Sequence, residues 1–311
     1  MTDPEMVSRI LELRDRFPTW GGRKLRTRLI RDGLEGTPAA STITEILRRE
    51  GRLTKPLRPQ RDLVRFQADH PNDLWQMDFK GDFALGDGSR CFPLTIIDDH
   101  SRFVPCLAAC PDQQRDTIQT HLIATFTTYG QPKCILCDNG PPWGSSRPNR
   151  YTRLGVWLIE HGIAVSHGRP HHPQTQGKDE RFHRTLNQDL ITTTAWENHP
   201  HIQHAFDTWL PTYNTYRPHH SLNGNVPADH YQPSPRPYTP TPPEPDYPNP
   251  RHVRRVHNGR INYHNTQYRV GHAFETKHVQ VHETDTTITI TYYTTPIRTH
   301  PKGVTHEPEH L

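Results

Sequence analysis

The chain has 311 residues, of which 32% are hydrophobic, and 31 prolines interrupt its apolar segments. This length and composition exclude one large core and predict two or three small domains joined by polar connectors. Lys and Arg (37) exceed Asp and Glu (33), and 23 histidines can add charge beside a polyanion, which favours a nucleic-acid partner.

Apolar runs in this chain stay below the roughly 18 residues of a membrane span, and the N-terminus lacks the apolar core of a signal peptide. We therefore expect a soluble, intracellular protein with no membrane partner. The five cysteines are an odd number and lie in strand-like segments, which predicts reduced core residues. Cys134 and Cys137 match C-x-x-C, but without a second pair at zinc spacing we expect no zinc site.

From Pro4 to Gly51, apolar residues recur every three to four positions, which predicts three short helices. Ser41 or Thr42 can cap the third helix. The second and third helices are basic, which suits a helix-turn-helix DNA-binding domain over residues 1–51. A helical bundle with a solvated basic face is the alternative. The residues that we expect to contact DNA here are Arg23, Lys24, Arg26 and Arg48.

Residues 52–72 are basic and poorly periodic, which indicates a linker. After it, Leu74 to Ala84 alternates between apolar and polar residues, which predicts a strand with Asp78 on its polar side. Two further hairpin-linked strands follow, and then helices alternate with strands as far as Tyr216. We expect an α/β fold with a mixed sheet over residues 73–231.

Proline is too frequent in residues 232–250 for a helix or sheet, which predicts an extended, semi-rigid spacer. Residues 251–298 are rich in Val, Ile, Tyr and Thr and contain turn signals, which predicts a small β-barrel. We expect residues 299–311 to be a disordered tail.

Asp138 directly follows the apolar run Cys-Ile-Leu-Cys and precedes Asn139-Gly140, which favours a turn. It therefore lies where an α/β sheet builds its sites, at the carboxyl end of a strand. Taken alone, Asp138 suits an Asx-turn or a helix cap equally well.

Glu180 belongs to a predicted helix in which Phe182, Leu186 and Leu190 form the apolar stripe. At about 100° per residue, Glu180 lies roughly 160° from Phe182, whereas Asp179 falls on the Phe182 side. Glu180 is the better ligand, although a glutamate in a first turn can also serve only to stabilise the helix dipole.

Carboxylates gathered at such a sheet repel one another, and divalent cations compensate that charge. Two Mg²⁺ or Mn²⁺ ions, bound by oxygen ligands, would support an in-line phosphoryl displacement.

Five motifs in chain order are LWQMDFKGDF, IIDDHSRF, LCDNGPPW, HPQTQGKDERFHRTL and YNTYRPHHSLNGNVPADHY. Together they resemble the DDE transposases of bacterial insertion sequences, relatives of retroviral integrases with a ribonuclease-H-like core. The resemblance covers about residues 70 to 235, and PTWGGRKLRTRL with STITEILRREG looks like the preceding helix-turn-helix.

On this resemblance, Asp78, Asp138 and Glu180 form the catalytic, metal-binding triad, while Asp98 and Asp99 have a turn or supporting role. It further implies DNA contacts for loop and helix residues, although each also suits a solvated position. These residues are Asn139, His172, Gln174, Lys178, Arg181 and Arg184.

The resemblance implies a transposase that binds transposon-end DNA, hydrolyses a strand and joins the freed 3′-hydroxyl to target DNA. It also implies at least a dimer on DNA, and a bacterial, nucleoid-associated location in the cytoplasm. Comparable enzymes often carry another helix-turn-helix ahead of PTWG, so an inactive relic that only binds DNA is the alternative. A ribonuclease-H-type nuclease is a third possibility, which the basic N-terminal helices disfavour.

Overall fold

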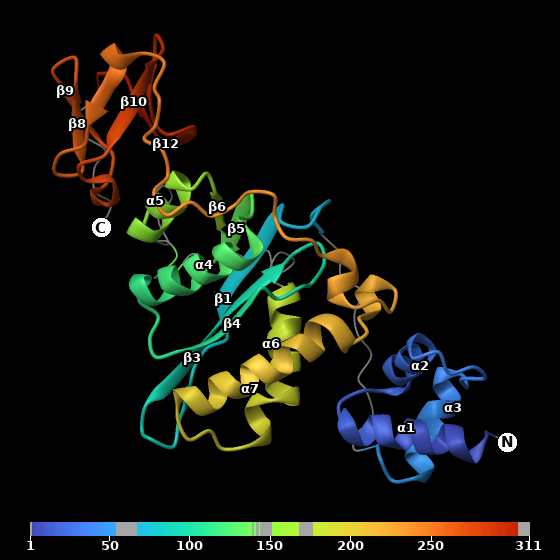
Figure 1. Cartoon of the computed structure of the whole chain (residues 1–311). Helices are drawn as coiled ribbons and strands as arrows, with labels where there is room; N and C mark the ends of the chain where they lie inside the picture. The colour runs from blue at the N-terminus through green and yellow to red at the C-terminus, as the bar shows by residue number, and fades with distance from the viewer. Residues whose placement is uncertain are drawn as a thin grey trace. The chain divides into compact units, whose positions relative to one another are not determined.

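The structure of the protein, a computed structural model, describes residues 2–53, 67–138, 140, 143, 151–167 and 177–303. Figure 1 shows the helices and strands of the chain. The chain divides into two compact units. Unit 1 comprises Met1–Asp112 and His171–Pro233, and unit 2 comprises Gln113–Pro170 and Ser234–Leu311. Within the described ranges, no helix is long and apolar enough to cross a lipid bilayer.

Unit 1 begins with the three predicted helices, α1 (Pro4–Arg16), α2 (Gly22–Arg31) and α3 (Ala40–Arg49). Their apolar faces meet in one core, in which no side chain is more than 6% exposed. The side chains of this core are Ile10, Trp20, Leu25, Leu29, Ile43, Ile46 and Leu47.

Helices α2 and α3 approach closely at Gly22. A Cβ atom added there would lie 2.4 Å from the carbonyl oxygen of Ala40. The expected cap at Ser41 or Thr42 is wrong, because α3 already begins at Ala40 and its N-cap, Ala39, makes no side-chain capping bond. The start of α3 is therefore packed against α2 at Gly22 and has no side-chain cap.

The sheet of unit 1 is antiparallel and contains β1 (Leu74–Phe79), β2 (Phe83–Ala84), β3 (Arg90–Asp98) and β4 (Cys106–Cys110). The single strand predicted from Leu74 to Ala84 is thus divided. The chain turns at Gly81, where φ is +87°, a value that favours glycine.

Four short helical turns and two longer helices complete unit 1. The longer helices are α6 (Gly177–Asp189) and α7 (His199–Pro211), and the turns are η1 (Ile191–Thr193), η2 (Thr212–Tyr216), η3 (His220–Leu222) and η4 (Pro227–His230). The apolar faces of α6 and α7 pack with β3 and β4 in a second core, which includes Phe182, Leu186, Phe206, Ile97 and Leu107.

The linker predicted over residues 52–72 ends earlier than expected. Residues 54–66 lie outside the described ranges, but the backbone N–H groups of Ala68 and Asn72 donate to the carboxylates of Asp99 and Asp98, each at 2.7 Å. The last residues of that segment are therefore part of the core domain.

Unit 2 contains α4 (Arg115–Tyr129), β5 (Cys134–Cys137), α5 (Arg153–Glu160) and β6 (Ala164–His167). Strands β5 and β6 pair in parallel, from Cys134 opposite Ala164 to Cys137 opposite His167. The fold is thus mixed α/β, with antiparallel pairing in unit 1 and parallel pairing here. All five cysteines are free thiols, as predicted.

The proline-rich segment is bound to unit 2 at its start. The guanidinium group of Arg236 donates to the carbonyl oxygens of Pro132 (2.6 Å), His161 (3.1 Å) and Gly162 (2.7 Å). The predicted extended spacer is therefore anchored near residue 236 to the turn regions around α4 and α5.

The C-terminal strands of unit 2 form a four-stranded antiparallel sheet, β12-β11-β10-β7, and a hairpin, β8-β9. Their bounds are β7 (Val253–Arg255), β8 (Arg260–Tyr263), β9 (Thr266–Arg269), β10 (His278–Glu283), β11 (Thr287–Tyr292) and β12 (Thr295–Pro301), with turns η5 (Pro250–His252) and η6 (His272–Phe274). A closed barrel stays a prediction. The tail expected to be disordered from residue 299 is wrong as far as Pro301, which ends β12.

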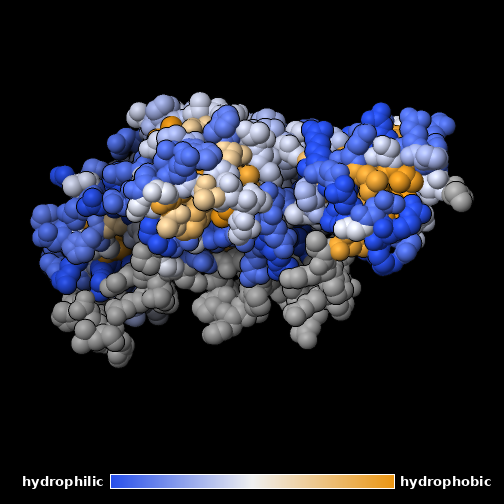
Figure 2. Space-filling model, turned by 90° about the horizontal axis from the view of Figure 1, so that it is seen from below, coloured by the Kyte–Doolittle hydropathy of each residue, from blue (hydrophilic) through white to orange (hydrophobic). Residues whose placement is uncertain are grey.

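The surface is largely hydrophilic on the face drawn in Figure 2, where hydrophobic residues form separate patches. Among the described residues, Ile30 is the large hydrophobic side chain that is exposed, at 47%. The other large hydrophobic side chains of these residues are buried or half-buried.

Candidate active site

Asp78 lies in β1, opposite Thr95 of β3, and is half-buried. Its carbonyl oxygen accepts a hydrogen bond of 3.0 Å from the hydroxyl group of Thr95. The polar side of β1 is more buried than alternation predicts, because Gln76 is only 1% exposed and donates to the carboxylate of Asp99 at 2.6 Å.

Glu180 lies in the first turn of α6 with an exposed side chain, whereas Phe182 and Leu186 are buried. The helical phase predicted from the sequence is confirmed. Asp179 is 4% exposed, which agrees with its predicted place on the Phe182 side. A carboxylate at this position of a helix is also stabilised by the N-terminal end of the helix dipole.

Asp138 follows β5 directly and is exposed, as expected for a residue at the carboxyl end of a buried strand. Its carbonyl oxygen lies 3.0 Å from Nδ1 of His167, the last residue of the neighbouring strand β6. Asn139, the predicted turn residue beside it, lies outside the described residues.

Asp78 and Glu180 belong to unit 1 and Asp138 to unit 2. Among the residues that the structure describes, no three His, Cys, Asp or Glu side chains gather closely enough to hold a metal ion. The triad therefore stays a prediction, with two of its members on adjoining elements of one unit.

The two acids of IIDDHSR are buried and bonded within the protein, which agrees with the turn or supporting role that the resemblance implies. Asp98 is fully buried and accepts hydrogen bonds from the backbone N–H and hydroxyl groups of Ser101. Burial raises the pKa of Asp98, and these hydrogen bonds oppose that rise. Asp99 is also fully buried and binds Gln76 and the backbone of Ala68.

Lys178 has an internal partner that the sequence did not indicate. Its ammonium group forms an ion pair with the carboxylate of Asp99 and lies 3.0 Å from the carbonyl oxygen of Asp99. Burial, followed by the charge of Arg102, lowers the pKa of Lys178 to about 8. The predicted contact of Lys178 with DNA stays a prediction, and so do those of Arg181 and Arg184, whose side chains are exposed. His172 and Gln174 lie outside the described residues.

The basic residues predicted to bind DNA on α2 and α3 differ in exposure. Arg23, Arg26 and Arg48 are exposed, and Arg48 forms an ion pair with Glu45 on the same helix. Lys24 is half-buried, and burial, followed by the charge of Arg217, lowers its pKa to about 7. Lys24 is thus a weaker candidate for a DNA contact than its exposed neighbours.

Two other arginines of α2 contact residues after α7. Arg28 lies over the ring of Tyr216, with 3.9 Å between the guanidinium carbon and the ring centroid. Arg31 donates to the carboxylate of Asp229 at 2.8 and 3.2 Å. These contacts join segments nearly 200 residues apart in the chain, so no local sequence pattern reveals them.

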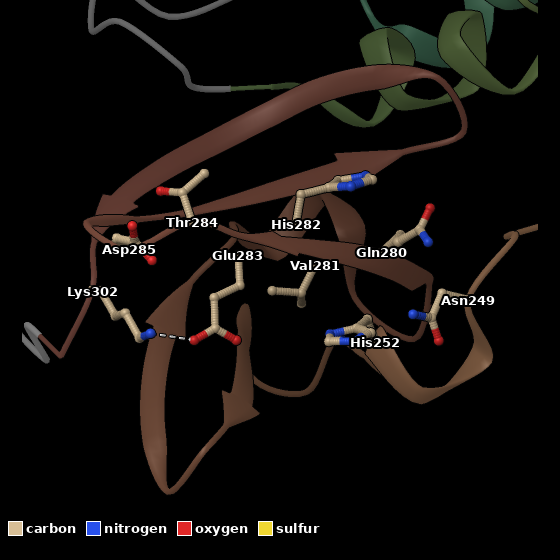
Figure 3. A pocket seen from close by; sticks show the side chains of 9 residues that line it. All are labelled: Asn249, His252, Gln280, Val281, His282, Glu283, Thr284, Asp285 and Lys302. Carbon is tan, nitrogen blue, oxygen red and sulfur yellow. Dashed lines mark ion pairs between the residues drawn. The ribbon is translucent and has the colours of Figure 1, made fainter.

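A cavity of about 460 Å³ in the C-terminal sheet region also contains acidic and imidazole side chains, drawn in Figure 3. Glu283 lies at its centre, but its carboxylate pairs with Lys302 and accepts a hydrogen bond of 3.0 Å from the hydroxyl group of Tyr263. These bonds lower the pKa of Glu283 to about 2. Its carboxylate is thus engaged within the protein, which leaves the residues near β1 and α6 as the better site.

The fold is that of a mixed α/β domain. Its candidate carboxylates are Asp138 after β5, Asp78 within β1 and Glu180 in the first turn of α6. Residues 68–173 match the integrase core domain family rve, and residues 161–227 match a second integrase core domain family, rve_3. This region of the chain belongs to the superfamily of insertion-sequence DDE transposases and retroviral integrases.

Curated relatives match the same region. An uncharacterized 39.2 kDa protein of insertion element IS476 from Xanthomonas euvesicatoria is 27% identical over 158 residues, which cover 51% of this chain and 44% of that protein. The Gag-Pro-Pol polyprotein of squirrel monkey retrovirus is 31% identical over 120 residues, which cover 39% of this chain and 6% of the polyprotein. The match thus spans less than half of either relative.

Two solved structures of viral proteins are similar to the structure of this chain. The HTLV-2 integrase catalytic core domain in complex with magnesium is 17% identical, covers 53% of this chain and all of that domain, and has a TM-score of 0.40. A chain of the simian T-cell lymphotropic virus intasome is 17% identical, with coverages of 93% and 98% and a TM-score of 0.44.

Proposed function

We propose that the protein is a metal-dependent DNA transposase that hydrolyses a phosphodiester bond at a transposon end and joins the freed 3′-hydroxyl to target DNA. The observation that carries this proposal is the exposed Glu180 on α6, a helix bonded to the strand pair that contains Asp78. The membership of residues 68–227 in the integrase core superfamily supports the same reaction.

The donor set suits hard divalent cations. Glu180 and Asp138 present exposed carboxylates, and Asp78 adds a half-buried one. Oxygen ligands that remain open to solvent are typical of Mg²⁺ or Mn²⁺ sites, because these ions keep several water ligands. The three carboxylates would hold two such ions.

When bound, the two cations would make a water molecule or 3′-hydroxyl a better nucleophile and offset the charge that develops on the phosphate. The residues of the chain would bind and orient the reactants. The Asp78 and Glu180 carboxylates would hold their positions through the contacts between β1, β3 and α6. The exposed Arg181 and Arg184, on the same helix as Glu180, would contact DNA phosphates.

Duplex DNA is the proposed partner of the N-terminal helices as well. The exposed Arg23, Arg26 and Arg48 would bind phosphates, which predicts a strong dependence of affinity on salt. Two transposon ends must be brought together for joining, so we propose that the working complex contains at least two copies of the chain.

An end-cleavage assay with the full chain tests the proposal. The substrates are duplexes taken from the DNA on either side of the reading frame, incubated with Mg²⁺ or Mn²⁺. We expect Glu180→Gln to slow cleavage about 1,000-fold, because loss of metal-ion catalysis costs several kcal/mol. Glu197→Gln, which alters another exposed glutamate of unit 1, is the matched control and should cleave normally. Inactive wild-type protein that still binds these duplexes would favour a relic that only occupies DNA.

A further inference from the structure

Helix α6 is fixed to the sheet of unit 1 by polar contacts on either side of Glu180. Two residues before it, Lys178 forms its ion pair with Asp99. Three residues after it, Nε2 of His183 lies 2.8 Å from the hydroxyl oxygen of Thr95. We call Thr95, Asp99, Lys178 and His183 the α6 clamp.

Thr95 contacts both His183 of α6 and the backbone of Asp78 in β1. The Thr95 hydroxyl group donates its one hydrogen to the carbonyl oxygen of Asp78, so it must accept from His183. The proton of neutral His183 is therefore assigned to Nε2. Burial, and secondarily the charge of Lys80, lowers the pKa of His183 to about 4, so the ring is neutral near pH 7. A continuous path of hydrogen bonds thus joins β1 to α6.

The Asp99 contact fixes the start of the helix. Asp99 is fully buried and also accepts 2.6 Å and 2.7 Å hydrogen bonds from Gln76 of β1 and the backbone of Ala68. A buried carboxylate of this kind needs its cation, because removing one partner leaves an uncompensated charge. Lys178 is therefore held at a fixed point beside β1.

Apolar packing alone does not fix Glu180 to this degree. Phe182 and Leu186 bury the opposite side of α6, but hydrophobic contacts are non-directional and allow small shifts along a helix. Hydrogen bonds depend steeply on distance and angle, so they set the axial position of α6.

We infer that Thr95 and His183 are positioning residues of the proposed active site, which hold the Glu180 helix at the position on β1 and β3 that metal binding requires. This inference rests on the proposed transposase function. Neither side chain needs to touch DNA or a metal ion for this role. Asp99 and Lys178 supply the second attachment point of the same helix.

Four variants of the full chain test the inference. Thr95→Val and His183→Leu each remove the hydrogen bond between the two side chains, whereas Thr95→Ser keeps the hydroxyl group and His183→Gln keeps an N–H donor. Thr125→Val is the matched control, because it deletes a buried hydroxyl group that donates only locally, to the carbonyl oxygen of His121 in α4.

Two readouts are measured for each variant: the cleavage rate across a Mg²⁺ titration, and the rise in melting temperature that Mn²⁺ causes without DNA. We expect Thr95→Val and His183→Leu to slow cleavage about 10- to 100-fold, since small misplacements cost this much. Both variants should also need about tenfold more metal for cleavage and for the rise in melting temperature, because residues that orient metal ligands affect metal affinity by this much. Thr95→Ser and His183→Gln should recover most of the loss, and Thr125→Val should alter only the melting temperature without metal.

The outcomes separate this inference from the proposed function. If wild-type protein cleaves DNA, but Thr95→Val and His183→Leu keep the wild-type metal dependence, the positioning role is wrong and the transposase stands. If wild-type protein neither cleaves nor responds to Mn²⁺, both are wrong. Should Thr95→Val fail to fold, the half-buried His183→Leu decides the question by the same two measurements.

Discussion

Arg31 of α2 donates two hydrogen bonds to the carboxylate of Asp229, at 2.8 and 3.2 Å. The same carboxylate accepts from the backbone N–H group of Val226 at 3.0 Å, so the pair joins the N-terminal helices to the turn η4. The hydrogen bonds from Arg31 are the main reason why the pKa of Asp229 lies below its usual value. A basic residue of α2 thus contributes to holding unit 1 together.

The Arg31–Asp229 pair predicts a small, measurable coupling. Both side chains are about one-third exposed, so solvent screening limits the interaction to about 0.5–1 kcal/mol. A double-mutant cycle with Arg31→Ala and Asp229→Ala, followed by urea unfolding, measures it. Because the folded pKa of Asp229 is lowered, this stability is present above its ordinary pKa of 3.8 and is lost as pH falls through the folded value. A coupling of zero at neutral pH would contradict the contact.

Gly22 predicts a steric effect between α2 and α3. An added Cβ would lie 2.4 Å from the carbonyl oxygen of Ala40 and 2.5 Å from the hydroxyl oxygen of Thr44, so the helices must separate. We expect Gly22→Ala to destabilise the protein by about 1–3 kcal/mol, as overpacking usually does. Gly21→Ala is the control, since nothing lies within 4 Å of its Cβ position. Equal melting temperatures for the two variants would refute the close approach.

The burial of Lys24 predicts that replacing this residue stabilises the protein, by an amount that depends on pH. Its pKa is lowered from 10.5 to about 7 by burial, then by Arg217 and Arg181, against the opposing charge of Asp189. Between these two pKa values the unfolded chain binds more protons, so the free energy of unfolding rises with pH. Lys24→Met should therefore raise the melting temperature most at about pH 6 and least above about pH 10.

Arg26→Met is the control for this measurement, because Arg26 is exposed on the same helix. Its melting temperature should differ from that of the wild type by a similar amount at both pH values. A Lys24→Met profile parallel to that of Arg26→Met would show that Lys24 is solvated as an ordinary lysine.

Arg236 predicts protection of the proline-rich segment from proteolysis. Its guanidinium group binds three carbonyl oxygens of unit 2, and Arg236→Ala removes all of them. We expect limited proteolysis to cut residues 237–250 faster in this variant than in the wild type, because cleavage follows local opening. Arg251→Ala, which changes an exposed arginine just beyond the segment, should leave the cleavage rate unchanged.

Features that depend on local periodicity could be predicted from the sequence. The phase of α6 separated exposed Glu180 from buried Asp179, because apolar positions repeat every 3.6 residues on a helix. The position of Asp138 after a buried strand followed from the turn signal beside it.

Features that depend on distant partners could not be predicted. Lys178 meets Asp99, 79 residues earlier, and the contact turns an expected DNA-facing charge into an internal ion pair. Gln76 is buried on the supposedly polar side of β1 because Asp99 accepts its hydrogen bond. Lys24 is similarly half-buried, near the charges of Arg217 and Asp189, which lie more than 160 residues later in the chain. In each case the partner comes from the tertiary fold, about which local sequence carries no information.

Strand joining with Mg²⁺ tests the central claim most directly. The rate at which the full chain joins a labelled transposon end to a target duplex is compared for the wild type, Asp138→Asn and Asp116→Asn. Asp116 is the control because it is another aspartate of unit 2, with a side chain that is 78% exposed. We predict that Asp138→Asn abolishes joining while DNA binding persists, and that Asp116→Asn joins at the wild-type rate. An unchanged joining rate in Asp138→Asn would contradict the proposed site.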